Sequence, residues 1–280
     1  MRLGILALMV CGLLSGEDVA LRGGNVLACE TYSFREPLLA GKLDVFAIPE
    51  LFKKHGIKGI SFNERYFTSR DEAYIDRLKT ATKDAGRTIV ALQADGNLAL
   101  ADEAKRRLQI EHYKESLRLA NRLGAPVMRI NAGAVSSGEN EAVGVRRLIE
   151  GLNEMLPLAR QLKVRIAIEN HGGVSSTADN LINIIRGTDS KWVGVLLDLG
   201  NFPPEIRYDE IQKLAPYTFG THVKVMKMNE RGDIEDYDIA RVFKILKAQK
   251  YKGSLSIEYS GRNDPMEGVP NSRDLIRKYW

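Results

Sequence analysis

The 280-residue chain has few cysteines, few histidines and no long block of charge of one sign. Because Cys11 and Cys29 are its only cysteines, a scaffold held together by several disulfides is excluded. The 41 basic and 36 acidic residues are spread along the chain, so the net charge of +5 does not by itself indicate a nucleic-acid-binding surface. With 44% hydrophobic and 28% charged residues, the composition is typical of a globular protein with one sizeable core.

The N-terminus carries one apolar run, from Leu3 to Leu14, which is shorter than the roughly 20 residues that span a bilayer. Arg2 precedes it, and small and polar residues follow it. This pattern predicts a cleaved signal peptide within residues 1–20, with Leu14-Ser15-Gly16 as the cleavage region. We therefore expect a secreted or periplasmic protein without a membrane anchor; if the run is only a hydrophobic extension, the protein is cytoplasmic. Cleavage would leave Cys29 without an intramolecular disulfide partner.

From about residue 25, β-like runs alternate with amphipathic helices. The runs are rich in Val, Ile and Leu and lie at residues 25–34, 57–62, 88–93, 126–131, 165–170, 193–198, 219–225 and 254–259. The helices are predicted at residues 44–56, 71–86, 103–124, 141–163, 177–187, 209–216, 237–249 and 272–280. Strands with little polar alternation are typical of a parallel sheet covered on both faces. The pattern predicts that residues 21–280 form a single (βα)₈ TIM barrel.

Four residues with metal-binding side chains stand at the ends of four consecutive predicted strands: Glu169, Asp198, His222 and Glu258. The active site of such a barrel lies at the carboxyl ends of its strands. The residues two positions earlier, which should also point inward, are mostly small: Ala167, Leu196, Gly220 and Ser256. A single acidic residue at a strand end is commonly solvated, but three carboxylates that converge need a cation to stay ionised. The pattern predicts a divalent metal site suited to Mn²⁺, Mg²⁺ or Co²⁺, with Zn²⁺ as an option.

The segments IENHGG, LLDLGNF, HVKV and IEYSG, in this order on the last four strands, resemble the sugar isomerase/epimerase branch of the xylose isomerase-like superfamily. MRINAG and ETYSF extend the resemblance over essentially the whole mature chain. The resemblance implies a xylose isomerase-like barrel holding one divalent metal, Mn²⁺ foremost, through Glu169, Asp198, His222 and Glu258. In the ketose 3-epimerases of this group, two glutamates also act as an acid/base pair on opposite faces of the substrate, and Glu169 and Glu258 match them.

A second tier of polar residues should lie above the metal ligands, where a substrate would bind. His171, Lys224 and Ser260 each follow a strand-end residue by two positions and so share its orientation. Lys224 is suited to stabilising oxyanion charge, and His171 to contacting a hydroxyl, although both also fit a supporting role at the rim. Arg129 would bind an anionic group or neutralise nearby carboxylates.

The chain departs from the 3-epimerases at substrate-contacting positions. Asn201 stands where they carry a histidine, and Met228 where they carry an arginine. We still expect Asn201 to contact substrate, but the substrate of those enzymes is not carried over. Glu64 and Arg65, which follow the second strand, are expected to lie in a solvated loop.

The expected activity is that of a sugar isomerase or epimerase that abstracts a proton beside a carbonyl polarised by the metal. An exported protein would meet an unphosphorylated keto sugar or a related polyol. The same site would also suit a lyase that dehydrates an inosose or cleaves a 3-keto glycoside. A binding protein with an inactive site is disfavoured, because both glutamates are present.

The AP endonuclease branch of the superfamily, and with it a nucleic-acid substrate, is also disfavoured. That branch uses three zinc ions and more histidine ligands than this chain can supply. Its histidines are His55, His112, His171 and His222, and the first two fall on predicted helices away from the strand ends.

Overall fold

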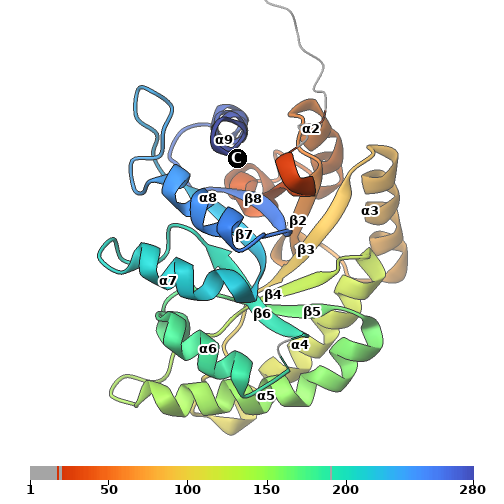
Figure 1. Ribbon diagram of the computed structural model, residues 1–280. Helices are drawn as coiled ribbons and strands as arrows, with labels where there is room; N and C mark the ends of the chain where they lie inside the picture. The colour runs from red at the N-terminus through yellow and green to blue at the C-terminus, as the bar shows by residue number, and fades with distance from the viewer. Residues whose placement is uncertain (1–17, 19–20, 190) are drawn as a thin grey trace, which may run out of the picture.

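The computed structural model describes residue 18, residues 21–189 and residues 191–280. Apart from Asp18, the predicted signal segment, including Cys11 and the Leu14-Ser15-Gly16 region, lies outside the described residues. In the described part of the chain, parallel strands β1 to β8 pair in sequence order, and β8 pairs with β1 to close a barrel. Figure 1 shows the long helices arranged around the outside of this barrel. The predicted TIM barrel is confirmed.

The strands coincide with the predicted β-like runs, and all but β1 and β2 agree with them to within one residue at each end. They are β1 (Val26–Glu30), β2 (Gly59–Asn63), β3 (Thr88–Ala94), β4 (Val127–Asn131), β5 (Arg165–Glu169), β6 (Val193–Asp198), β7 (Thr218–Val225) and β8 (Ser254–Tyr259). The α-helices are α1 (Arg35–Leu39), α2 (Ile48–Lys54), α3 (Glu72–Asp84), α4 (Glu103–Leu123), α5 (Glu141–Leu162), α6 (Ala178–Arg186), α7 (Arg207–Leu214), α8 (Ile239–Ala248) and α9 (Pro265–Tyr279).

Polar residues at the N-termini set where several helices begin. The side chains of Asp71, Asp102 and Asp238 accept hydrogen bonds from backbone N–H groups in the first turns of α3, α4 and α8. Gly124 ends α4 in the left-handed region, with φ of 84°, which costs little without a Cβ atom. No helix in the part of the chain that the structure describes is both long and apolar enough to cross a membrane.

The last helix was predicted too short. The apolar pattern indicated a helix at residues 272–280, but α9 already begins at Pro265. Asp264 caps it by accepting a hydrogen bond from the backbone N–H of Met266, and proline suits the first helical position. The early turns carry few apolar residues, so periodicity alone does not reveal them.

Two hydrophobic clusters form the core. The larger lies between the barrel and its helices. The smaller one fills the amino end of the barrel interior and contains Ala91, Val127, Ala167 and Leu196, with the partly buried Phe219 packed against it. The predicted inward orientation of Ala167 and Leu196 agrees with this cluster. Filling one end of the interior leaves the carboxyl end for polar side chains.

Candidate active site

The four strand-end residues predicted to bind metal come together in the structure. Glu169, Asp198, His222 and Glu258 are all buried, and each offers a ligand atom within 4.8 Å of the others. Nδ1 of His222 lies 3.1 Å from Oε1 of Glu169 and 3.6 Å from Oε2 of Glu258. Asp198 is the register partner of His222, whereas Glu169 lies opposite Leu196 and Glu258 opposite Lys224. The four side chains therefore meet across staggered parallel strands.

Asn170 ties the ends of β5 and β6 together. Its Nδ2 donates to the backbone oxygen of Asp198 at 2.9 Å, and its Oδ1 accepts from the backbone N–H of Asp198 at 2.7 Å. Oδ1 of Asp198 in turn accepts from the backbone N–H groups of Gly200 and Asn201. These bonds fix the carboxylate and leave Oδ2 facing the cluster. This role of Asn170 was not predicted from the sequence.

The two glutamates have opposite electrostatic surroundings. Burial raises the pKa of Glu169, but Arg129 and then His222 outweigh burial, so the pKa lies well below its usual range. Burial and the neighbouring Asp198 carboxylate raise the pKa of Glu258 well above its usual range, although Lys224 opposes them. Repulsion between Asp198 and Glu258 is therefore a property of this cluster that a cation would relieve.

Lys224 carries positive charge into the cluster from β7. Its Nζ lies 3.3 Å from Oδ2 of Asp198 and 3.3 Å from Oε2 of Glu258. It also donates to Oδ1 of Asn201 at 2.9 Å. Burial lowers the pKa of Lys224, but Asp198 and Glu258 raise it more, so the amine keeps its proton. The structure thus brings both Lys224 and Asn201 to the cluster, and Nδ2 of Asn201 is buried with no hydrogen-bond partner among the described residues.

Arg129 is surrounded by carboxylates. Its guanidinium lies 2.7 Å from Asp95, 3.0 Å from Glu169 and 3.9 Å from Glu30, and the residue is buried. Of the two roles predicted for Arg129, the geometry favours neutralising neighbouring carboxylates over binding an anionic substrate group.

Glu30, at the end of β1, is a member of the site that sequence analysis did not single out. Its Oε2 lies 3.2 Å from Nε2 of His222, and its Oε1 accepts from Nδ2 of Asn63 at 3.3 Å. The side chain is 1% exposed. The signal was present, since VLAC followed by Glu30 repeats the apolar-run-then-acid pattern of β5 and β6.

A cavity of about 510 Å³ opens above the cluster. Its wall includes the predicted residues Arg129, Glu169, His171, Lys224 and Glu258. Asn201 is not part of this wall but supports Lys224 from behind it. Further wall residues that the sequence did not indicate are Tyr32, Asn63, Asp95 and Asn131.

The expectation of a solvated loop after β2 is wrong for Glu64. Its carboxylate is buried, accepts a hydrogen bond from Ser116 at 2.9 Å and lies 3.1 Å from Nε2 of His112. Arg65 is about half exposed, as expected, but it pairs with Asp95 at 2.9 Å and lines the cavity. His112 on α4 and His55 after α2 lie outside the four-residue cluster.

The cluster fits a divalent cation. Three carboxylates and one imidazole, all buried and within 4.8 Å, make a hard-to-borderline donor set. A cation among these oxygens would offset the repulsion that raises the pKa of Glu258.

Comparison with known proteins agrees with the fold. Residues 49–279 match the family model described as xylose isomerase-like TIM barrel. An uncharacterised protein of Methanocaldococcus jannaschii is 24% identical over 204 residues, which are 66% of this chain and 67% of that protein.

Two solved structures extend the comparison. A 3-keto-D-glucoside 4-epimerase from E. coli aligns with a TM-score of 0.74 and 14% identity, over 91% of this chain and 99% of that one. A D-psicose 3-epimerase from Clostridium cellulolyticum, solved with D-tagatose, aligns with a TM-score of 0.71 and 17% identity, over 85% of this chain and 94% of that one. At these identities the likeness shows the fold alone.

Proposed function

Because the chain belongs to the xylose isomerase-like TIM barrel family, we propose that it is a divalent-metal-dependent sugar isomerase or epimerase. The observation that carries this proposal is the meeting of Glu169, Asp198, His222 and Glu258 within 4.8 Å below a cavity of about 510 Å³. The cavity is large enough for a monosaccharide, and its wall is polar.

These four residues would hold the cation, with Mn²⁺ proposed first and Mg²⁺, Co²⁺ or Zn²⁺ also suited to the donors. When bound, the cation supplies electrostatic stabilisation for negative charge that develops on the substrate oxygen.

Glu169 and Glu258 are proposed as the acid/base pair. They project from β5 and β8 and approach the same nitrogen of His222, at 3.1 Å and 3.6 Å, from different strands. One carboxylate would take the proton from the carbon beside the carbonyl, and the other would return a proton to the opposite face. Lys224, 3.3 Å from Glu258, would add positive charge beside the developing oxyanion.

An unphosphorylated substrate is favoured by the charges of the wall. Arg129 already faces three carboxylates, and Lys224 faces two. A phosphate would add two negative charges beside these acids, and the two buried cations of the described wall, Arg129 and Lys224, are already paired with carboxylates. The two solved relatives described above are named for D-psicose and for a 3-keto-D-glucoside, which supports a keto sugar.

The test is incorporation of solvent deuterium. The protein with Mn²⁺ would be incubated in D₂O with keto sugars, inososes and 3-keto glycosides, and products followed by NMR and mass spectrometry. Proton abstraction predicts deuterium on the carbon next to the carbonyl, and an epimer or isomer as product; an unsaturated product would instead identify the lyase. Turnover without deuterium in substrate or product, over repeated forward and reverse conversions, would contradict the proposal.

A further inference from the structure

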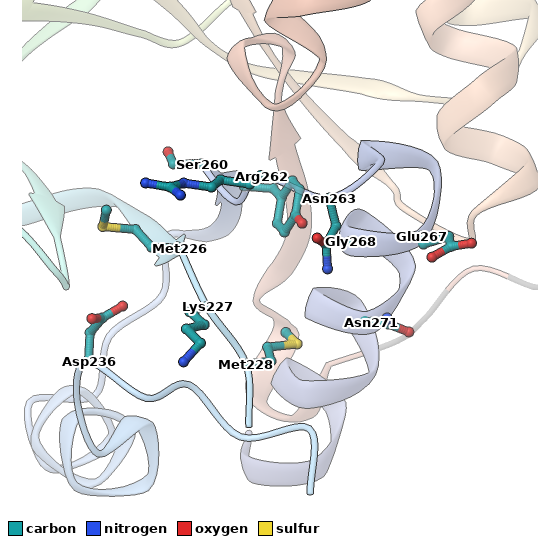
Figure 2. Close-up of a pocket in the computed structure, with 11 residues that line it drawn as sticks. Met226, Lys227, Met228, Asp236, Ser260, Arg262, Asn263, Glu267, Gly268 and Asn271 are labelled. Carbon is teal, nitrogen blue, oxygen red and sulfur yellow. The ribbon is translucent and has the colours of Figure 1, made fainter. Parts of the chain in front are cut away.

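A second hollow lies beside the site cavity, between the loop after β7 and the start of α9. We call it the β7–β8 groove and define it by Met226, Met228, Tyr259, Ser260 and Asn271, with other residues at its edges. Its volume is about 590 Å³, comparable to that of the site cavity. Figure 2 shows side chains from the loop on one side and from α9 on the other.

The groove and the site cavity share Ser260, which belongs to the wall of both. The backbone N–H of Ser260 donates to the oxygen of Val225 at 2.8 Å, which holds the residue against the end of β7. Its hydroxyl oxygen is buried and has no hydrogen-bond partner among the described residues. A ligand that reaches from one hollow into the other would pass this hydroxyl and could bond to it.

The wall of the groove is built around Tyr259. A Cβ atom added at Gly261 or Gly268 would overlap the tyrosine ring, so both positions are compatible only with glycine while the ring stays in place. The ring is 6% exposed overall, yet it is part of the groove wall. The groove therefore has a rigid aromatic side, close to Glu258.

The chemistry of the groove matches a neutral ring that carries hydroxyl groups. Met226 is 55% exposed, which is unusual for a large apolar side chain, and Met228 lines the same groove. The amides of Asn263 and Asn271 line the same space. Thioethers and an aromatic ring suit the apolar face of a sugar or phenyl ring, and amides suit its hydroxyls.

The charges at the edges also point to a neutral occupant. Lys227 and Arg262 are balanced by Asp236 and Glu267, so the groove has no excess of either sign. A phosphate or carboxylate would meet as many repulsive as attractive groups.

We infer that the β7–β8 groove is a subsite for the non-reacting ring of a glycoside. The reacting ring would lie on the acidic cluster, the glycosidic link beside Ser260, and the second sugar or aromatic ring against Met226 and Tyr259. The substrate class is then a keto glycoside. The placement of the reacting ring rests on the proposed function, whereas binding in the groove stands on its own.

The test compares ligands that have or lack the second ring. Binding of D-glucose, methyl β-D-glucoside, phenyl β-D-glucoside and cellobiose to the full chain would be measured by NMR titration. Phenyl β-D-glucoside and cellobiose should bind more tightly than D-glucose. Met226 and Asn271 are both exposed. The double variant Met226→Ala/Asn271→Ala should bind phenyl β-D-glucoside and cellobiose about tenfold more weakly, and its affinity for D-glucose should be unchanged.

Met266→Ala is the matched control, because Met266 is 40% exposed on α9 but does not line the groove. Equal affinities for one-ring and two-ring ligands, or a double variant that binds them as the parent does, would overturn the groove subsite. Loss of groove binding in the variant, combined with no deuterium exchange on any sugar, would retain the subsite and reject the proposed function. Deuterium exchange on a sugar, combined with unchanged affinities of the double variant for the two-ring ligands, would retain the proposed function and reject the subsite.

Discussion

Oε2 of Glu30 lies 3.2 Å from Nε2 of His222, on the side of the imidazole away from Glu169 and Glu258. A carboxylate in this position favours the proton on Nε2 and leaves the lone pair of Nδ1 directed at the acidic cluster. Asn63 holds the other oxygen of Glu30 at 3.3 Å. Neither Oε2 of Glu30 nor Nε2 of His222 makes a hydrogen bond among the described residues, so this contact is electrostatic. We predict that the charge of Glu30 orients the imidazole, without Glu30 belonging to the four proposed ligands.

Replacing Glu30 by glutamine should lower Mn²⁺ affinity by about tenfold, since the amide no longer favours one tautomer of His222. His222→Ala should lower the affinity at least as much, because it removes a donor atom. Affinities would be measured by titration against a competing chelator. Glu36→Gln is the control, at a side chain that is 82% exposed. Unchanged affinity in the Glu30 variant would contradict the orienting role.

Changing Glu169 or Glu258 to glutamine should lower kcat about 100-fold or more, the usual scale for loss of a general acid or base. Both residues are also proposed metal ligands, so kcat must be measured at Mn²⁺ concentrations shown to saturate each variant. Retention of more than a tenth of the parent kcat in both would refute the acid/base assignment.

Lys224→Met should lower kcat less than either glutamate change, because the lysine supplies charge and does not carry the proton. Its Nζ lies 3.3 Å from a carboxylate oxygen of Asp198 and 3.3 Å from one of Glu258. Loss of the lysine therefore also removes the positive charge that reduces the repulsion between these two carboxylates. Lys224→Arg keeps the positive charge, so its kcat should lie between that of the parent and that of Lys224→Met. Steady-state kinetics on the same substrate check this order, and a loss equal to that of Glu258→Gln would give Lys224 a larger role.

Arg129→Met should lower the free energy of unfolding of the metal-free protein by about 3 kcal/mol, because Glu30, Asp95 and Glu169 lose their buried counter-charge. Mn²⁺ should restore part of this loss, since it supplies positive charge to the same carboxylates. Urea unfolding with and without metal measures both effects. Arg65→Met, at a half-exposed arginine of the same cavity, should cost less than about 1 kcal/mol.

Cys29 should not react with a thiol reagent in the folded protein. The side chain is fully buried on β1, and burial raises the pKa of the thiol far above its usual range, so little thiolate is available. In a Cys11→Ser chain, one thiol should react with Ellman's reagent only after denaturation. Rapid labelling of the native chain would show that β1 opens.

The alternation of strands and helices was predictable because each element carries its own local pattern. Glu169, Asp198, His222 and Glu258 could be predicted because each lies at or near the carboxyl end of a predicted strand, and these ends face the active site of such a barrel. Glu30 obeys the same rule, but the aromatic residues Tyr32 and Phe34 that follow it extend the β-like pattern and hide the end of β1. The strand stops there, and Thr31–Phe34 turn away as a 3₁₀ helix.

The surroundings of some site residues could not be predicted, because they depend on contacts between residues far apart in the sequence. Glu64 is buried because Ser116, 52 positions later in the chain, donates to its carboxylate. For the same reason, the sequence does not decide between the two predicted roles of Arg129. Whether it meets a substrate or other side chains depends on Asp95, a residue from a different strand end.

The apolar cluster at the amino end of the barrel has a consequence for turnover. Leu196 and Val127 close that end, and Arg165 stacks on Phe219 at 4.3 Å beneath them. The reacting molecule and its product must therefore use the same mouth, at the carboxyl end. Product must leave before the next substrate molecule can enter, so the product should act as a competitive inhibitor. The rate of product release then sets an upper limit on kcat.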